Sequence, residues 1–249
     1  MAEERTASGD RGCFFSLFFD KAPLIFLKET GENAILIAEN KGCRTLHRRE
    51  KRMKYNMMFQ MLGKTLDSIT KEKLTDKTQR KEIRNTYREI VERAKDIGSK
   101  NKLISSYGLA AYFIAMNRKG SLTPEENFRI LDDGMRKSRL LKTFMGDAKH
   151  YFSEKNMESR RKWSAETHKR KYENDWVVDV LEKSGDYEFG LDYTECGVCK
   201  LCRQEGCPEL AEYLCRLDFM LVEIMGIGLK RTMTLAEGAE KCDFRFLKQ

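Results

Sequence analysis

Eight cysteines occur in the chain, and six of them lie after residue 195. The first four of these six form the run C-x2-C-x2-C-x4-C, followed directly by proline: Cys196, Cys199, Cys202 and Cys207. Bacterial iron-sulfur proteins use C-x2-C-x2-C-x3-C-P, so here the last gap is one residue longer. Four closely spaced thiolates also suit tetrahedral zinc. The run leaves three interpretations open: an iron-sulfur site, a zinc site, or incidental thiols at a helix start.

A thiol and a carboxylate come next, on a segment with helical periodicity. Apolar residues recur every three or four positions and predict a helix over 208–226 with one buried stripe: Leu210, Leu214, Leu217, Leu221 and Ile224. Cys215 and Asp218 are three residues apart and therefore project together beside this stripe. A carboxylate at the edge of an apolar face is costly unless a partner satisfies it. Asp218 either pairs with a basic neighbour such as Arg231 or converges with Cys215 on a pocket.

A second thiol and carboxylate pair opens the last strand candidate. Cys242 and Asp243 are adjacent, so in a strand their side chains point to opposite faces. Only one of them can face the same pocket as Cys215. We expect that residue to be Cys242, because it shares its face with the apolar Phe244.

The elements that must position these residues indicate an α+β fold. Up to about residue 175 the patterns are helical, and Thr123, Pro124 and Glu126 predict a helix start with a capping box. After Trp176, strand patterns over 187–193, 228–235 and 242–247 flank the 208–226 helix. We expect a small antiparallel sheet with one helix packed across it.

The charge distribution separates two regions. Residues 176–249 carry nine Lys and Arg against 14 Asp and Glu, a net charge of −5, whereas the whole chain carries +8. Residues 1–175 therefore form a basic, mostly helical region, and residues 176–249 form a cysteine-rich α+β region, either as two units or as one continuous domain. The basic charges alternate with acidic ones and lack interleaved aromatic residues or glycines, so nucleic acid is not the expected partner.

Neither a secretion signal nor a membrane span is predicted. The apolar run over 13–27 follows acidic residues, is interrupted by Asp20, Lys21 and Pro23, and is too short to cross a bilayer. Cysteines without a signal peptide indicate a reducing compartment, so we expect a cytoplasmic protein. We expect a small-molecule substrate and no membrane partner, and a homo-oligomer is compatible with the sequence.

The C-terminal segment, about residues 176–249, resembles the L-2-amino-thiazoline-4-carboxylic acid hydrolase family. The pieces that carry the resemblance are Cys196 and the stretches GCPEL (206–210), LCRLD (214–218), RTMTLAEG (231–238) and CDFRF (242–246). The family pattern falls on Cys196, Cys215, Asp218, Arg231, Thr232, Thr234, Gly238, Cys242, Asp243 and Arg245. Cys199, Cys202 and Cys207 are additions to that pattern.

The resemblance implies hydrolytic opening of a cyclic isothiourea to a carbamoyl-cysteine without a cofactor. The thiolate of Cys215 or Cys242 would attack the ring carbon, or Asp218 would act as general base on water, with Cys196 in the same catalytic set. The substrate-binding set would be Arg231, Thr232, Thr234 and Arg245, in which an arginine clamps the ring carboxylate. Two alternatives to a hydrolase remain: an iron-sulfur or zinc protein that uses the 196–207 cysteines, and a non-catalytic small-molecule-binding module.

Overall fold

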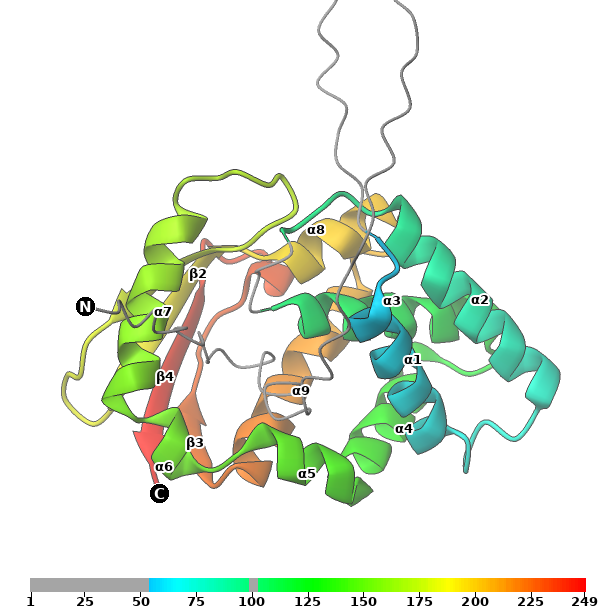
Figure 1. The fold of residues 1–249 in the computed structure, drawn as a ribbon, viewed down its shortest axis with the longest axis horizontal. Coiled ribbons are helices and arrows are strands. Elements are labelled where there is room, and N and C mark those ends of the chain that lie inside the picture. Colours follow the sequence, from blue (N-terminus) through cyan, green and yellow to red (C-terminus); the bar gives the residue numbers. More distant parts are fainter. Residues whose placement is uncertain (1–53, 99–102) are drawn as a thin grey trace, which may run out of the picture.

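The structure, a computed structural model, describes residues 54–98 and 103–249, so the apolar run over 13–27 lies outside the described residues. Seven described helices precede the first strand: α1 (Met57–Thr70), α2 (Lys77–Arg93), α3 (Ile104–Lys119), α4 (Pro124–Lys137), α5 (Arg139–Met145), α6 (Ala148–Tyr151) and α7 (Glu154–Thr167). Figure 1 shows α1 to α4 at one end of the molecule and the sheet at the other, with α9 between them. None of the described helices combines the length and the apolar character that crossing a bilayer requires.

The C-terminal part contains a four-stranded antiparallel sheet. Its order is β1-β2-β4-β3, from β1 (Val177–Leu181), β2 (Phe189–Glu195), β3 (Ile227–Lys230) and β4 (Cys242–Lys248). Helices α8 (Gly197–Gln204) and α9 (Leu210–Ile224) connect β2 to β3, and the short 3₁₀ helix η2 (Leu235–Glu237) lies between β3 and β4. The predicted α+β class, helices followed by a small antiparallel sheet, is confirmed.

Three details of the predicted sheet were wrong. Strand β1 was not predicted, although it pairs with β2 along its whole length. Strand β3 ends at Lys230 and not at 235, because residues 231–234 form a loop held by the Asp243 side chain, which accepts hydrogen bonds from the backbone N–H groups of Thr232 and Met233 at 2.8 Å each. We expected one helix to pack on the sheet, but two do: α7 lies against β1 at one sheet edge, and α9 lies against β3 at the other.

The helix signals of the sequence act as predicted at α4. The Thr123 hydroxyl accepts a hydrogen bond from the Glu126 N–H, and the Glu126 carboxylate accepts one from the Thr123 N–H at 2.8 Å. This reciprocal pair satisfies two N–H groups that the helix start would otherwise leave free. It fixes the start of α4, which packs along α9.

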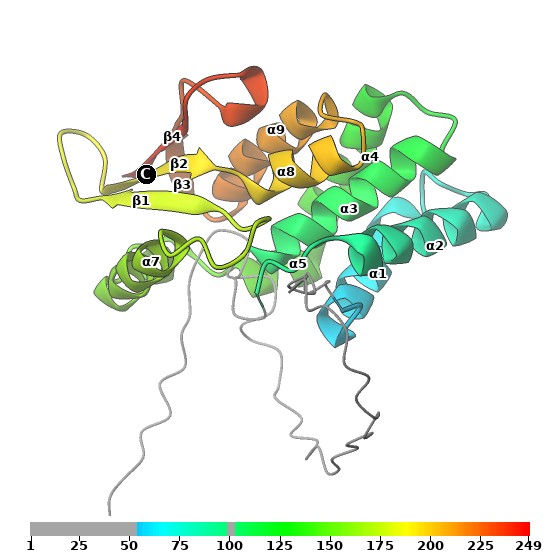
Figure 2. The same ribbon diagram turned by 90° about the horizontal axis from the view of Figure 1, so that it is seen from above.

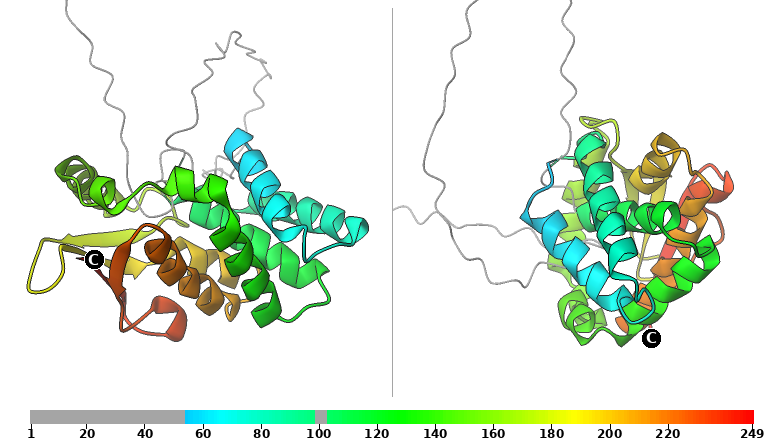
Figure 3. Two further views of the ribbon diagram at one scale, coloured as in Figure 1. Left: turned by 90° about the horizontal axis from the view of Figure 1, so that it is seen from below. Right: turned by 90° about the vertical axis from the view of Figure 1, so that its right-hand side faces the viewer.

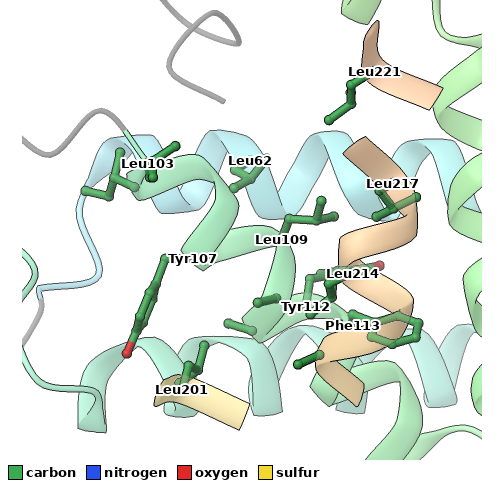
Figure 4. Close-up of a cluster of buried hydrophobic side chains, with 14 of the residues drawn as sticks. Leu62, Leu103, Tyr107, Leu109, Tyr112, Phe113, Leu201, Leu214, Leu217 and Leu221 are labelled. Atoms are coloured by element: carbon green, nitrogen blue, oxygen red, sulfur yellow. The ribbon is translucent and has the colours of Figure 1, made fainter. Parts of the chain in front are cut away.

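The buried side chains form one continuous cluster that joins the helices to the sheet. Helix α3 is at its centre and is buried on almost all sides over Tyr107–Met116. Figure 4 shows α3 side chains facing the α9 stripe that the sequence predicts, among them Leu109, Tyr112, Phe113, Leu214 and Leu217. The stripe buries α9 against α3, and the residues on its flank therefore face the space between these helices and the sheet.

The two faces of the sheet differ in polarity. Tyr193 pairs with Cys242 and Leu191 with Phe244, so these residues share the inner, apolar face. Helix α7 covers part of this face, where the Trp163 and Tyr193 rings lie 6.3 Å apart, and Figure 2 shows α7 running beneath β1. On the outer face, Asp192 binds Lys241 and Arg245 in ion pairs of 2.7 and 2.6 Å.

Helix α8 is fixed at both ends. Near its start, Lys200 donates hydrogen bonds to the carbonyls of Glu173 and Asp175 at 2.8 Å each. At its end, the carboxylate of Glu205 accepts hydrogen bonds from Arg93 of α2 at 2.8 Å and from Arg118 of α3 at 2.5 Å. Figure 3 shows the ribbon from two further sides, with α8 next to the helical layer. These contacts set the position of Cys196, the residue immediately before α8.

Candidate functional site

A cavity of about 80 Å³ lies where α3, α8 and α9 meet the inner face of the sheet. Its walls are mostly apolar and aromatic: Leu103, Leu109, Trp176, Tyr193, Val198, Leu214, Phe244 and Phe246. Its polar lining groups are Ser106, Cys196, Cys215, Asp218 and Cys242. A concave apolar site with a few converging polar groups is the usual form of a small-molecule site.

All four candidate catalytic residues of the sequence line this cavity. Cys215 and Asp218 reach it from the flank of the α9 stripe, and Cys242 reaches it from the start of β4 on the inner face, next to Phe244. Cys196 reaches it from the N-cap position of α8. Cys196 follows the end of β2 and Cys242 begins β4. These two cysteines are 46 residues apart in the sequence but line one cavity, because β2 and β4 are neighbours in the sheet.

The backbone at Cys196 is tightly held. A Cβ atom added to Gly197 would lie 2.6 Å from the carbonyl oxygen of Asn174 and 2.7 Å from the Trp176 ring. Only glycine allows α8 to approach this segment so closely without moving backbone atoms. Gly197 thus fixes the cysteine that precedes it.

The electrostatic surroundings distinguish Cys196 from the other cavity thiols. A hydrogen bond from the thiol of Cys199 lowers the pKa of Cys196; burial opposes this shift, and the backbone N–H groups of Cys199 and Val198 add to it. No cap hydrogen bond of standard geometry is formed, but the start of a helix favours a negative charge at this position. Burial instead raises the pKa of Cys215 well above its usual value and that of Cys242 to about 12. Of these three cavity thiols, Cys196 is the one that most readily becomes a thiolate.

Asp218 is a largely buried carboxylate, with 18% of its side chain exposed, and its pKa lies near 6. Burial raises its pKa to about 6, and this rise is limited by the charge and hydrogen bond of Arg231. The Arg231 guanidinium donates to Oδ2 of Asp218 at 2.7 Å and to the carbonyl of Cys215 at 3.0 Å. It also lies between the rings of Phe219 and Phe244, at 4.8 and 5.1 Å from their centroids. A carboxylate with such a pKa can accept and return a proton under physiological conditions.

Replacing Arg231 with glutamine should raise the pKa of Asp218 above 6, because the ion pair that favours the charged form is lost. The folded protein then retains the Asp218 proton to higher pH than the unfolded chain does, so stability should decrease as pH rises through this window. At pH 8 we expect a loss of about 3 kcal/mol, typical of a broken buried pair, and a smaller loss at pH 5. Urea denaturation at both pH values measures this difference, and equal losses at pH 5 and 8 would contradict the account.

The expected substrate-binding residues do not line the cavity. Arg231 is occupied by Asp218, and Arg245 points to the outer face, where it binds Asp192 at 2.6 Å. The Thr232 hydroxyl donates to Asp243 at 2.6 Å, and the Thr234 hydroxyl donates to Glu237 at 2.7 Å. These four residues shape the loop and strand around the cavity, and the arginine clamp for a substrate carboxylate is not among the cavity walls.

The structure separates the four cysteines of the run. Over residues 54–98 and 103–249, no three His, Cys, Asp or Glu side chains are grouped so that they could hold a metal ion. The reason is that α8 separates the run into two pairs: Cys196 and Cys199 at its start, and Cys202 and Cys207 at its end. The zinc and iron-sulfur alternatives built on Cys196, Cys199, Cys202 and Cys207 remain predictions of the sequence, which this arrangement of the described residues does not support.

Several cavity residues could not be recognised in the sequence. Ser106 lies on α3, whose residues are apolar on nearly every side, so no periodic signal singles out this hydroxyl. Trp176 precedes strand β1, which the sequence did not predict. Its place in the cavity wall depends on the close packing of Gly197 against the Trp176 ring, which no local pattern indicates. Neither His150 nor His168 lines the cavity, and His168 lies 2.9 Å from Asp179 on the exposed side of β1.

An apolar cavity with a thiolate-favouring cysteine and a carboxylate of near-neutral pKa has the features of a small-molecule catalytic site. A family model described as L-2-amino-thiazoline-4-carboxylic acid hydrolase matches residues 101–246, and the chain belongs to this family. The match begins well before Trp176 and includes every residue that lines the cavity. No curated protein and no solved structure was found to match the chain.

Proposed function

We propose that the protein hydrolyses a small cyclic amidine or isothiourea of the 2-amino-thiazoline-4-carboxylate type. The observation that carries this proposal is the meeting of Cys196 and Asp218 in one apolar cavity that the family match encloses. A carbon between nitrogen and sulfur atoms is electrophilic, so it requires a nucleophile and a group that moves protons. Cys196 supplies the first and Asp218 the second.

In the first half of the proposed reaction, the thiolate of Cys196 attacks the ring carbon between the two nitrogens and the sulfur. The bond from this carbon to the ring sulfur then breaks, and the sulfur leaves as a thiolate that takes a proton from solvent water. The product of this half is an isothiourea ester on Cys196. The apolar walls keep the intermediate away from bulk water and strengthen the charge interactions in the cavity.

In the second half, Asp218 accepts a proton from a water molecule that attacks the isothiourea carbon. The bond to Cys196 breaks, the thiolate is released, and Asp218 returns its proton to solvent water. The sum is one substrate and one water converted to a carbamoyl-cysteine, with the enzyme unchanged. Arg231 is a positioning residue here, because it holds the carboxylate of Asp218 and keeps its pKa near 6.

The test is incubation of the purified protein with 2-amino-thiazoline-4-carboxylate, with detection of the released thiol and of the product mass. We expect one thiol for each substrate consumed. Cys207→Ser serves as a matched control, since Cys207 belongs to the same cysteine run but does not line the cavity. Saturable binding without any thiol release, seen by calorimetry, would contradict the proposal and identify a non-catalytic binding module.

The basic helices do not require a nucleic-acid partner in this proposal. Several of their arginines are paired with carboxylates, among them Arg88 with Glu92 at 2.7 Å and Arg136 with Asp132 at 2.9 Å. Paired charges release few counterions from nucleic acid and give weak, salt-sensitive binding. The apolar cavity supports a small molecule as the proposed partner.

A further inference from the structure

Cys196 and Cys199 have the spacing and the location of a redox-active dithiol. The sequence Cys196-Gly-Val-Cys199 occupies the N-cap and first turn of α8. Residues three apart at a helix start lie close together, within the range that a disulfide can bridge. C-x-x-C at a helix N-terminus is the arrangement that thiol-disulfide oxidoreductases use.

The two thiols differ in access, as the two steps of disulfide exchange require. Cys196 is partly buried and lines the cavity, so a small molecule in the cavity can reach its sulfur. Cys199 is only 4% exposed and does not line the cavity, but its thiol acts on Cys196 through a hydrogen bond. The Cys196 thiol can therefore attack a disulfide that enters the cavity. The Cys199 thiol can then attack the Cys196 sulfur from the side away from the cavity.

We propose that Cys196 and Cys199 form a thiol-disulfide exchange centre that accepts a low-molecular-weight disulfide in the cavity. The Cys196 thiolate attacks one sulfur of the disulfide RSSR, which forms a mixed disulfide and releases one RS⁻. The Cys199 thiol then loses its proton and attacks the Cys196 sulfur, which forms the Cys196–Cys199 bond and releases the second RS⁻. Two protein thiols are oxidised, and one disulfide is reduced to two thiols.

The neighbouring thiols are less suited to this exchange. Cys242 accepts a hydrogen bond from the Leu235 N–H at 3.2 Å and extends from the sheet, while Cys215 extends from α9. Neither is connected to Cys196 by a short helical turn. Cys202 and Cys207 are at the far end of α8, where Cys202 is fully buried. Oxidation should therefore select the Cys196–Cys199 pair.

This exchange does not depend on hydrolase activity, and its readout is a protein mass. If both proposals hold, the Cys196–Cys199 bond also removes the nucleophile and stops hydrolysis. Loss of turnover on oxidation would be a consequence of the exchange, not the evidence for it.

The sequence permits an unambiguous test by trypsin digestion. Cleavage after Lys183 and Lys200 gives a peptide whose only cysteines are Cys196 and Cys199. Cys202, the pair Cys207 and Cys215, and Cys242 fall on three other peptides. The reduced full-length protein is incubated with glutathione disulfide, quenched in acid, alkylated and mapped.

In the wild type we expect the 184–200 peptide without alkylation and lighter by two hydrogens than its reduced form. Cys199→Ser, and Cys199→Ala as a second variant, should instead accumulate glutathione on Cys196, because the resolving thiol is absent. Cys196→Ser should leave Cys199 reduced, and the control Cys207→Ser should behave as wild type. A wild-type protein that stays reduced, oxidises all thiols at similar rates, or joins Cys196 to Cys215 or Cys242 overturns the proposal.

Discussion

Replacing Cys196 with serine is expected to lower kcat for the cyclic substrate by about 10³-fold or more, as removal of an attacking nucleophile does in other enzymes. A serine hydroxyl at this position would remain protonated at neutral pH, whereas the Cys196 thiol has its pKa lowered by Cys199 and by the start of α8. KM should change much less than kcat, because the cavity walls stay in place.

The fold should survive this substitution, since serine at a helix N-cap is well tolerated. Circular dichroism and thermal unfolding of the variant check this. Cys215→Ser and Cys242→Ser provide the comparison, because both line the same cavity and both have raised pKa values. We expect them to retain at least about a tenth of the activity. If one of them loses activity while Cys196→Ser remains active, the assignment of the nucleophile is wrong.

The pH profile should show the titration of Asp218. Since burial raises its pKa to about 6, the carboxylate that accepts the proton from water is mostly protonated below this pH. Where the second half of the reaction limits turnover, we therefore expect kcat to fall about tenfold for each pH unit below 6 and to level off above it. Ionisation of Cys196 does not contribute to this step, because its sulfur is already bound to the substrate carbon. Initial rates from pH 4.5 to 9 in buffers of constant ionic strength measure the profile.

Asp218→Asn should remove the inflection near pH 6 and lower the rate by about 10²- to 10⁴-fold, the usual contribution of a general base. The amide keeps the size of the side chain and can still accept a hydrogen bond from Arg231. Structural damage should therefore be small, and thermal unfolding of the variant checks this point. An unchanged inflection in Asp218→Asn would show that another group titrates and would exclude Asp218 as the base.

The residues on α9 could be predicted from the sequence because one helical period fixes both the buried stripe and its flank. Once Leu214 and Leu217 are buried, Cys215 and Asp218 must lie at the edge of the same surface. Side chains along β4 alternate between the two faces of the sheet, so burial of Phe244 places Cys242 on the inner face as well. Local periodicity was sufficient for these positions.

The properties of Cys196 and Arg231 could not be predicted, because they depend on contacts between distant segments. The sequence indicates neither that α8 begins immediately after Cys196 nor that Gly197 packs against Trp176. The sequence left two roles open for Arg231, a partner of Asp218 or a clamp for the substrate carboxylate, and the folded loop directs it to Asp218 at 2.7 Å. Which of the two applies becomes visible only when the tertiary structure is known.

The preference for Cys196 as nucleophile also follows from tertiary contacts. From the sequence, Cys215 and Cys242 were the leading thiols, since each stands near a carboxylate. In the structure burial is the main cause that raises the pKa of both thiols, and the charge of Asp218 adds to it. For Cys242 this outweighs the hydrogen bond from the Leu235 N–H, whereas the Cys199 thiol and two backbone N–H groups lower the pKa of Cys196. Proximity to Asp218 therefore supports proton transfer and not activation of Cys215.

The most direct test of the account is a rapid-quench experiment that detects the covalent intermediate. Excess 2-amino-thiazoline-4-carboxylate is mixed with the enzyme, the reaction is stopped with acid within one turnover, and the protein is digested with trypsin. The account predicts the mass of the ring-opened substrate on the 184–200 peptide, located at Cys196 by fragmentation and increased in Asp218→Asn. Turnover with no adduct on Cys196 in either protein, or an adduct on Cys215 or Cys242, would contradict it.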